Sequence, residues 1–161
     1  MTQRVDLSTV MDRLSIDAVI TGYAVAVDDG AWKDYLALFT ADGRADYRTA
    51  GGIEGPAGDV AQWLSETMRM FPVRQHLIVN RRLDLQDLGG YPGDRARVQA
   101  DYVNPMRLVS EGARSEDRPA APNFVSGGRY AFELLRTDGG WRIESVTVHE
   151  KWRNLPGSLA G

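Results

Sequence analysis

The sequence predicts an α+β fold in which three helices of the N-terminal half pack on one face of a curved, mostly antiparallel sheet. Apolar residues recur at helical spacing up to Pro72 and alternate with a period of two after it. The later connections LGGYPGD and TDGG are short and rich in turn residues, as antiparallel hairpins require. A chain of 161 residues is long enough for one core, so we expect a single domain over residues 1–161.

The three helices are expected over residues 8–30, 32–39 and 59–71. Pro72 ends the third helix, for which Asp59 is a good N-cap. The apolar stripe of the first helix comprises Ile16, Ile20, Tyr23 and Val27. The stripe of the second comprises Trp32, Tyr35, Leu36 and Phe39. The first two helices are therefore expected to form a hairpin.

A short strand over residues 44–48 and four long strands are expected. The long strands cover residues 74–87, 95–109, 124–137 and 141–152. Gly127 and Gly128 are followed by a strand and not by a helix, so we interpret them as a bulge that curves the sheet and not as a phosphate-binding loop. Residues 110–122 form a long, polar, proline-containing connection of the kind that acts as a lid or is mobile.

Composition argues against several classes of function. The net charge is -3 and Lys and Arg are not clustered, so no nucleic-acid partner is expected. The chain has no cysteine and two histidines, which argues against a metal site, and no cofactor is expected. No apolar run is long enough for a signal peptide or a membrane span, so we expect a cytoplasmic protein without a membrane partner.

The segment VRQHLIVN raises the question of why a buried strand carries His76 and Asn80. Alternation places both on the face of Ile78, and it places Tyr102 and Asn104 on one face of the next strand. A buried polar group without a partner costs about 1 to 3 kcal/mol, so such residues either bond within the core or line a pocket. Both interpretations are open for each of these residues.

A candidate partner for His76 is Asp28, near the C-terminal end of the first helix. The helix macrodipole disfavours an anion there by a few tenths to about 1 kcal/mol, so Asp28 is either solvated, together with Asp29, or given a compensating cation. A carboxylate in contact with an imidazole fixes its tautomer and raises its basicity, which would make His76 a general base near neutral pH. The alternative is a core histidine and a separate, solvated turn.

Three segments carry a resemblance to a known family. They are YAVAVDDGAWKDYLALFTADGRADYR, RQHLIVN and GGRYAFELLRTDGGWRI. In them the chain resembles the SnoaL-like branch of the nuclear transport factor 2-like superfamily, which includes scytalone dehydratase, lindane dehydrochlorinase, bile acid dehydratases, ketosteroid isomerases, polyketide cyclases and the β subunits of ring-hydroxylating dioxygenases. The resemblance spans residues 14–152 and implies a cone-shaped, cystatin-like domain around a mostly apolar pocket.

The resemblance also implies site residues. Its Asp-His pair matches Asp28 and His76, a tyrosine that holds the substrate carbonyl in some dehydratases matches Tyr23, and a ligand-contacting tyrosine of scytalone dehydratase matches Tyr47, which gives four candidate catalytic residues. The third-strand contacts of scytalone dehydratase fall at VSGGRY, which completes the candidate substrate-binding residues Asn80, Tyr102, Asn104, Ser126 and Tyr130. The second catalytic histidine of scytalone dehydratase has no match in DYVNPMRL, which argues against elimination of the scytalone type.

The remaining polar and aromatic candidates are interpreted as structural. His149 is expected on the pocket wall or the surface, and Arg136 as a solvated hairpin arginine. Trp32, Trp63 and Trp141 lie at core-periodic or strand-start positions and are expected to pack.

We expect a cofactor-independent dehydratase, isomerase or cyclase. In it His76, oriented by Asp28, removes a proton from carbon of a hydrophobic polycyclic, steroid-like or polyketide-like substrate, and Tyr23 or Tyr47 donates to the oxyanion. The alternative is a non-catalytic small-molecule-binding domain, or a structural subunit like the dioxygenase β chain, in which Asp28 and His76 only tie helix to sheet. The resemblance further implies a homo-oligomer, most often a dimer, with a trimer as the alternative.

Overall fold

The structure, a computed structural model, describes residues 6–86, 88–109 and 121–154. Its helices are α1 (Leu7–Asp29), α2 (Trp32–Ala37) and α3 (Ala57–Thr67), with 3-10 turns η1 (Arg48–Ala50) and η2 (Met68–Met70). Its strands are β1 (Phe39–Asp46), β2 (Glu54–Pro56), β3 (Val73–Arg74), β4 (Leu77–Gln86), β5 (Arg95–Arg107), β6 (Phe124–Thr137) and β7 (Gly140–Asn154). The loop expected over residues 110–122 lies outside the described residues, except for its last two positions.

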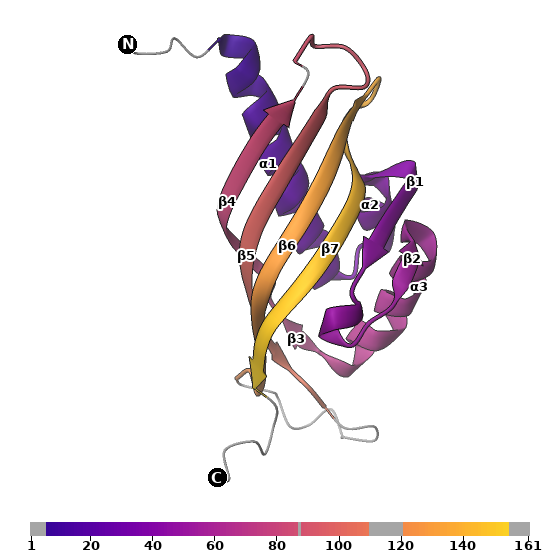
Figure 1. The fold of residues 1–161 in the computed structure, drawn as a ribbon. Coiled ribbons are helices and arrows are strands. Elements are labelled where there is room, and N and C mark those ends of the chain that lie inside the picture. Colours follow the sequence, from indigo (N-terminus) through magenta and orange to yellow (C-terminus); the bar gives the residue numbers. More distant parts are fainter. Residues whose placement is uncertain (1–5, 87, 110–120, 155–161) are drawn as a thin grey trace.

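The described strands form one curved, open sheet (Figure 1). Their order is β2-β1-β7-β6-β5-β3, and β4 also pairs with β5. These pairs are antiparallel except that of β1 with β7. The helix α1 lies across one face of β4 to β7, whereas α2 and α3 lie beside β1 and β2 (Figure 1). The expected α+β architecture, with helices on a curved antiparallel sheet, is confirmed.

The long helix α1 supplies one wall of the core. It begins where the carboxylate of Asp6 accepts a hydrogen bond from the Ser8 N–H, and it ends at Gly30, whose φ of 65° reverses the chain. The expected stripe is confirmed, because its members are all buried: Ile16, Ile20, Tyr23 and Val27. None of the helices in the described ranges, α1 included, is long and apolar enough to cross a lipid bilayer.

Long-range pairing overrides the local pattern after α1. The second helix ends at Ala37, and Phe39 instead starts β1, where it pairs with Ile143 of β7. Phe39 is buried in either conformation, so its helical spacing did not distinguish helix from strand. The register of β1 with β7 is irregular between Phe39 and Arg44. The polar residues TADG (40–43) lie in this irregular part of β1 and do not end the chain segment as a turn.

The glycine-rich segment before α3 also differs from expectation. Residues Glu54–Pro56 form β2 and pair with β1, although no alternating pattern marks them. The third helix then begins at Ala57, after Pro56, so Asp59 lies in its first turn and is not its N-cap. The helix ends at Thr67, and η2 carries the chain to Pro72.

The strand expected over residues 74–87 is divided. Gln75 and His76 belong neither to β3 nor to β4, and the Gln75 N–H donates to the Pro105 carbonyl (3.1 Å). A bulge follows at Asn80, which has a φ of 50°, where the register with β5 shifts between Val79 and Arg82. Strict alternation therefore holds for only part of this segment.

A bulge is present at Gly127 and Gly128, but its extra residue lies in β7, opposite the two glycines. Gly127 pairs with Trp152, whereas Gly128 pairs with Glu150, so Lys151 is an extra residue in β7. A Cβ on Gly128 would lie 2.2 Å from a β7 carbonyl oxygen, and one on Gly127 would lie 2.3 Å from the Trp152 ring. Close approach of β7 therefore requires both glycines.

The expectation of a solvated Arg136 was wrong. Its side chain is 17% exposed and donates to Asp12 of α1 (2.7 Å) and to Asp94 (3.0 Å). Its guanidinium lies 4.6 Å from the ring centroid of Trp141, whose indole N–H also donates to Asp12 (3.1 Å). Trp141 is 3% exposed, so its expected packing role is confirmed. This cluster fastens α1 to the β6–β7 hairpin.

Candidate active site

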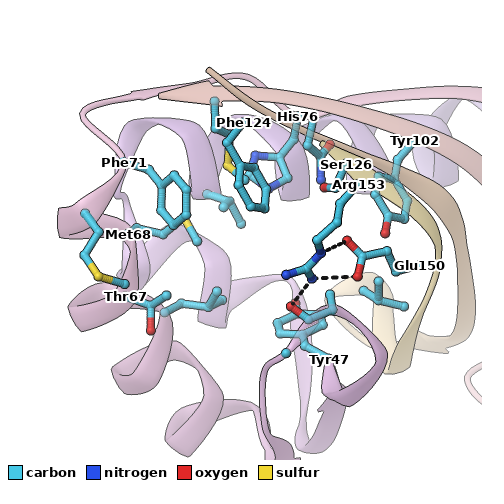
Figure 2. Close-up of a pocket in the computed structure, with 18 of the residues that line it drawn as sticks. Tyr47, Thr67, Met68, Phe71, His76, Tyr102, Phe124, Ser126, Glu150 and Arg153 are labelled. Carbon is cyan, nitrogen blue, oxygen red and sulfur yellow. Dashed lines mark hydrogen bonds and ion pairs between the residues drawn. The ribbon is translucent and has the colours of Figure 1, made fainter. Parts of the chain in front are cut away.

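A cavity of about 290 Å³ opens between the inner face of the sheet and the helices (Figure 2). At ~30 Å³ for each molecule of liquid water, this volume corresponds to about ten non-hydrogen atoms. Most of its wall is apolar and includes Val27, Leu64, Met68, Met70, Phe71, Met106, Phe124 and Val148. Trp63 also lines the cavity, in addition to packing against the core. Such a cavity suits a small hydrophobic molecule with few polar groups.

Asp28 and His76 meet at the edge of this cavity. The Oδ1 of Asp28 lies 2.6 Å from His76 Nδ1, and both carboxylate oxygens accept the backbone N–H of His76 (3.0 and 2.9 Å). His76 occupies the gap between β3 and β4, so Asp28 replaces the sheet partner that this N–H lacks. The loss of one ladder position thus turns the histidine toward α1.

The pairing fixes the tautomer of His76. An ionised carboxylate only accepts hydrogen bonds, so Nδ1 must carry a proton to approach it to 2.6 Å. In the neutral ring, Nε2 then holds the lone pair. The ring is 8% exposed and lines the cavity, and Nε2 has no hydrogen-bond partner among the described residues. The site therefore presents a basic nitrogen to whatever occupies the cavity.

Arg74 places a cation at the C-terminal end of α1. Its Nε donates to the carbonyls of Val27 and Asp28 (3.0 Å each), and its Nη1 donates to the carbonyls of Met68 (2.9 Å) and Phe71 (3.2 Å). The charge offsets the helix dipole, and the contacts join α1 to η2. Arg74 thus holds the backbone that carries Asp28, although sequence patterns gave it no role.

Three tyrosine hydroxyls form a chain beside the dyad. The Tyr47 hydroxyl bonds to that of Tyr23 and also to that of Tyr35 (2.9 Å). Burial raises the pKa of each of the three phenols, so all three keep their protons at neutral pH. Either oxygen can donate in each of these bonds, and Tyr130, another phenol of the lining, packs against Tyr23. If Tyr35 donates to Tyr47 and Tyr47 donates to Tyr23, the O–H of Tyr23 is left for Tyr130 or for a ligand in the cavity.

The sheet contributes four of the expected binding residues. Tyr102, Asn104, Ser126 and Tyr130 all line the cavity. Tyr102 is 2% and Asn104 5% exposed, yet the Tyr102 hydroxyl and the Asn104 Oδ1 have no hydrogen-bond partner among the described residues. Each such atom costs about 1 to 3 kcal/mol unless it is paired. A ligand in the cavity can supply the missing partners.

The expectation that Asn80 shares this face was wrong. The bulge at Asn80 breaks the alternation, and its side chain is exposed and donates to Asp101 (3.2 Å), away from the cavity lining. His149 is also exposed and does not line the cavity, in agreement with the surface alternative.

Two cavity residues escaped the sequence patterns. Glu150 and Arg153 form an ion pair (2.6 Å) in the cavity lining, near the C-terminal end of β7 (Figure 2). In a regular strand, residues three apart face opposite sides, so their charges gave no hint of a shared site. The sequence feature that could have revealed them is the glycine pair of β6, because it lies opposite the bulge that shifts the alternation of β7.

The fold and site together define a pocket protein of the α+β class, with an Asp-His pair at the cavity edge. Comparison with known families agrees, because the SnoaL-like domain family matches residues 8–147. The chain belongs to the SnoaL-like domain family.

Relatives and solved structures extend this result. The uncharacterized protein Rv2910c of Mycobacterium tuberculosis is 32% identical over 137 residues, which cover 85% of this chain and 84% of that protein. The hexachlorocyclohexane dehydrochlorinase LinA-type3 of Novosphingobium barchaimii LL02 superposes with a TM-score of 0.73 at 17% identity, over 96% of this chain and 97% of that chain. A scytalone dehydratase-like protein of Novosphingobium aromaticivorans gives a TM-score of 0.71 at 17% identity, over 96% and 98%. At these identities the two structures show a shared fold.

Proposed function

We propose that the protein is a small-molecule lyase or isomerase in which His76 Nε2 removes a proton from carbon next to a carbonyl. The observation that carries this proposal is the 2.6 Å contact of Asp28 with Nδ1 of His76, a residue that lines the cavity, which leaves Nε2 free to act as the base. Dehydrochlorinase and dehydratase names among the structural neighbours support the same class of reaction. Asp28 orients the ring and stabilises the imidazolium that forms.

The first step moves one proton and one electron pair. The C–H proton passes to Nε2, and the bonding pair shifts through carbon onto the carbonyl oxygen to give an enolate. The spare O–H of Tyr23 donates to that oxygen, in a place shielded from water. The enolate then either expels a leaving group from the next carbon, which is elimination, or takes the proton back at another carbon, which is isomerisation. General base catalysis contributes ~10²- to 10⁴-fold, so positioning in the cavity must supply the remainder.

Hydrophobic polycyclic ketones, including steroid-like and polyketide-like compounds, are the proposed substrate class. The apolar wall suits fused rings, and the cavity accommodates about ten non-hydrogen atoms within it. Larger skeletons would extend through the mouth of the cavity.

Proton exchange tests this function without the natural substrate. 1-Tetralone in D₂O reports removal of a proton beside its carbonyl, because deuterium enters at that carbon and NMR detects it. We expect exchange to be faster with the protein than in buffer, to fall to the buffer rate for His76→Gln, and to fall about 10- to 100-fold for Tyr23→Phe. If His76→Gln folds and exchanges at the wild-type rate, the base is elsewhere. If the wild type gives no exchange and His76→Gln only lowers Tm, the non-catalytic alternative is correct.

We also propose a homodimer that forms through the outer face of the sheet. The hydrophobic side chains of Leu77, Val79, Val103 and Trp152 are 38% to 46% exposed on β4, β5 and β7. Leu77 and Val103 are register partners, so part of this surface is continuous. Light scattering after size exclusion gives the mass: a dimer is expected, a trimer would correct the stoichiometry, and a monomer would contradict the proposal.

A further inference from the structure

The end of β7 places an ion pair in the cavity through a local break in strand alternation. Glu150 and Arg153 both line the cavity although they are three residues apart. The bulge at Lys151 inserts one residue, so Glu150 and Arg153 face inward while Lys151 and Trp152 face outward. Lys151 accordingly lies 4.0 Å from the outer-face carboxylate of Asp101.

The guanidinium of Arg153 is held by three hydrogen bonds, and some of its N–H groups have no acceptor among the described residues. Its Nε and Nη2 donate to the two carboxylate oxygens of Glu150 (2.8 and 2.6 Å), and Nη2 also donates to the Ala50 carbonyl (3.0 Å). Its Nη1 has no acceptor among the described residues. Figure 2 shows the guanidinium extending into the cavity from β7. Two N–H groups are thus available to an occupant.

The unpartnered polar atoms of β5 lie in the same part of the cavity. Sheet register aligns Tyr102 with Gly128 and Glu150 in one row, and Asn104 with Ser126 and Arg153 in the next. Gly128 has no side chain, so nothing separates Tyr102 from the ion pair, and the Tyr102 hydroxyl points toward it (Figure 2). The buried Tyr102 hydroxyl and Asn104 Oδ1 therefore share one polar subsite with Arg153.

Charge decides which chemistry this subsite accepts. Glu150 already neutralises Arg153. An anionic ligand would bring an uncompensated negative charge into a partly buried site and would be disfavoured. A neutral oxygen function avoids this cost and still accepts from Nη1 and from the Tyr102 hydroxyl, and a ligand hydroxyl can in addition donate to Asn104 Oδ1.

We infer that Arg153, Tyr102 and Asn104 form a second polar subsite, which binds a neutral oxygen function of the ligand such as an ether, ketone or hydroxyl. The inference rests on the proposed function in one respect: it assigns the reacting carbonyl to Tyr23 and His76, so this oxygen is a second one on the same skeleton. The ligand class is then a fused-ring ketone that carries another neutral oxygen, and carboxylates are discriminated against.

Matched pairs of tetralones test the subsite. 6-Methoxy- and 7-methoxy-1-tetralone each have an ethyl counterpart of equal size, in which CH₂ replaces the ether oxygen, and a carboxylate counterpart. Isothermal titration calorimetry gives Kd for each. A hydrogen bond from a charged donor contributes ~1.5 to 3 kcal/mol, so at least one methoxy compound should bind about 10-fold or more tightly than its ethyl and carboxylate counterparts.

Variants assign the preference to named residues. The double variant Glu150→Gln/Arg153→Met removes the guanidinium without leaving an unpaired carboxylate. It should bring the Kd values of the methoxy and ethyl compounds together, so that their ratio falls to unity, while 1-tetralone still binds. Lys151→Met, on the outer face, is the matched control and should keep the ratio. His76→Gln should lose exchange but keep the ratio, which separates this inference from the proposed function. Equal binding of both methoxy-ethyl pairs, tighter binding of a carboxylate, or a ratio unchanged in the double variant would each overturn the inference.

Discussion

Replacing Asp28 with Asn should reverse the tautomer of His76 while leaving the fold intact. In the wild type, two donors of His76, the backbone N–H and Nδ1–H, meet a carboxylate that only accepts. A carboxamide has one accepting oxygen and one donating nitrogen. If the oxygen takes the backbone N–H, the amide nitrogen must donate to Nδ1, so the proton of the ring moves to Nε2.

The magnitudes follow from the hydrogen bonds. A bond to a charged acceptor is favourable by ~1.5 to 3 kcal/mol, which favours the Nδ1–H tautomer of the wild type by roughly 10- to 150-fold. In Asp28→Asn both bonds are retained as neutral ones, so the free energy of unfolding should fall by only about 1 kcal/mol. Exchange of 1-tetralone should fall ~10²- to 10⁴-fold, because Nε2 no longer offers a lone pair.

Nitrogen NMR of protein labelled at histidine measures the tautomer directly. The chain has two histidines, and His149 is exposed, so one ring reports the site and the other is an internal reference. Asp29→Asn is the matched control, since it alters the neighbouring, exposed acid of the same helix end. An Nε2–H tautomer for neutral His76 in the wild type, or full exchange activity in Asp28→Asn, would refute this assignment of the base.

Two further predictions concern stability. Burial raises the pKa of five of the six tyrosines, so above pH 10 the unfolded chain loses protons that the folded chain keeps, and stability should fall by up to about 1.4 kcal/mol per pH unit for each group. The five buried phenols are Tyr23, Tyr35, Tyr47, Tyr102 and Tyr130. Absorbance at 295 nm should then show at most one phenol ionising before the protein unfolds at alkaline pH. Ionisation of several phenols before unfolding would contradict the burial of these tyrosines. Hydrogen bonding to Arg136 lowers the pKa of Asp12, so this group stabilises the fold above its unfolded pKa of ~3.9 and loses that effect as the pH falls. Asp12→Asn should therefore lower the free energy of unfolding in urea by about 2 kcal/mol at pH 7 and by less at pH 3, whereas Glu54→Gln, in an exposed pair, should cost under ~1 kcal/mol.

Sequence patterns predicted the elements whose burial follows a single period. The stripe of α1 and the strands β5, β6 and β7 repeat every 3.6 or two residues over most of their length, because each presents one face to the core. Local patterns could not reveal β2 or the early start of β1, because those strands are defined by partners distant in the sequence. Asp28 and His76 were paired through the resemblance and the helix dipole, and not through spacing, since 48 residues separate them.

The errors at the site share one physical cause. Asn80 was expected to line the cavity and does not, whereas Arg153 was not expected and does. In both cases a bulge inserts a residue and inverts every face assignment beyond it. Alternation counted through a bulge therefore gives the wrong face, and the glycine pair Gly127 and Gly128 of β6 lies opposite the point where the count in β7 must restart.

The same bulge connects the sheet's curvature to its chemistry. Gly127 and Gly128 let β7 approach β6 closely, and the bulge at Lys151 opposite them turns Arg153 to the inner face that Glu150 already occupies. At the opposite edge, the gap between β3 and β4 frees the His76 N–H for Asp28. His76 and Arg153 thus reach the cavity where the regular ladder is interrupted. The uninterrupted β5–β6 ladder supplies the remaining polar groups of the sheet and the packed core that holds these two positions apart: Tyr102, Asn104, Ser126 and Tyr130.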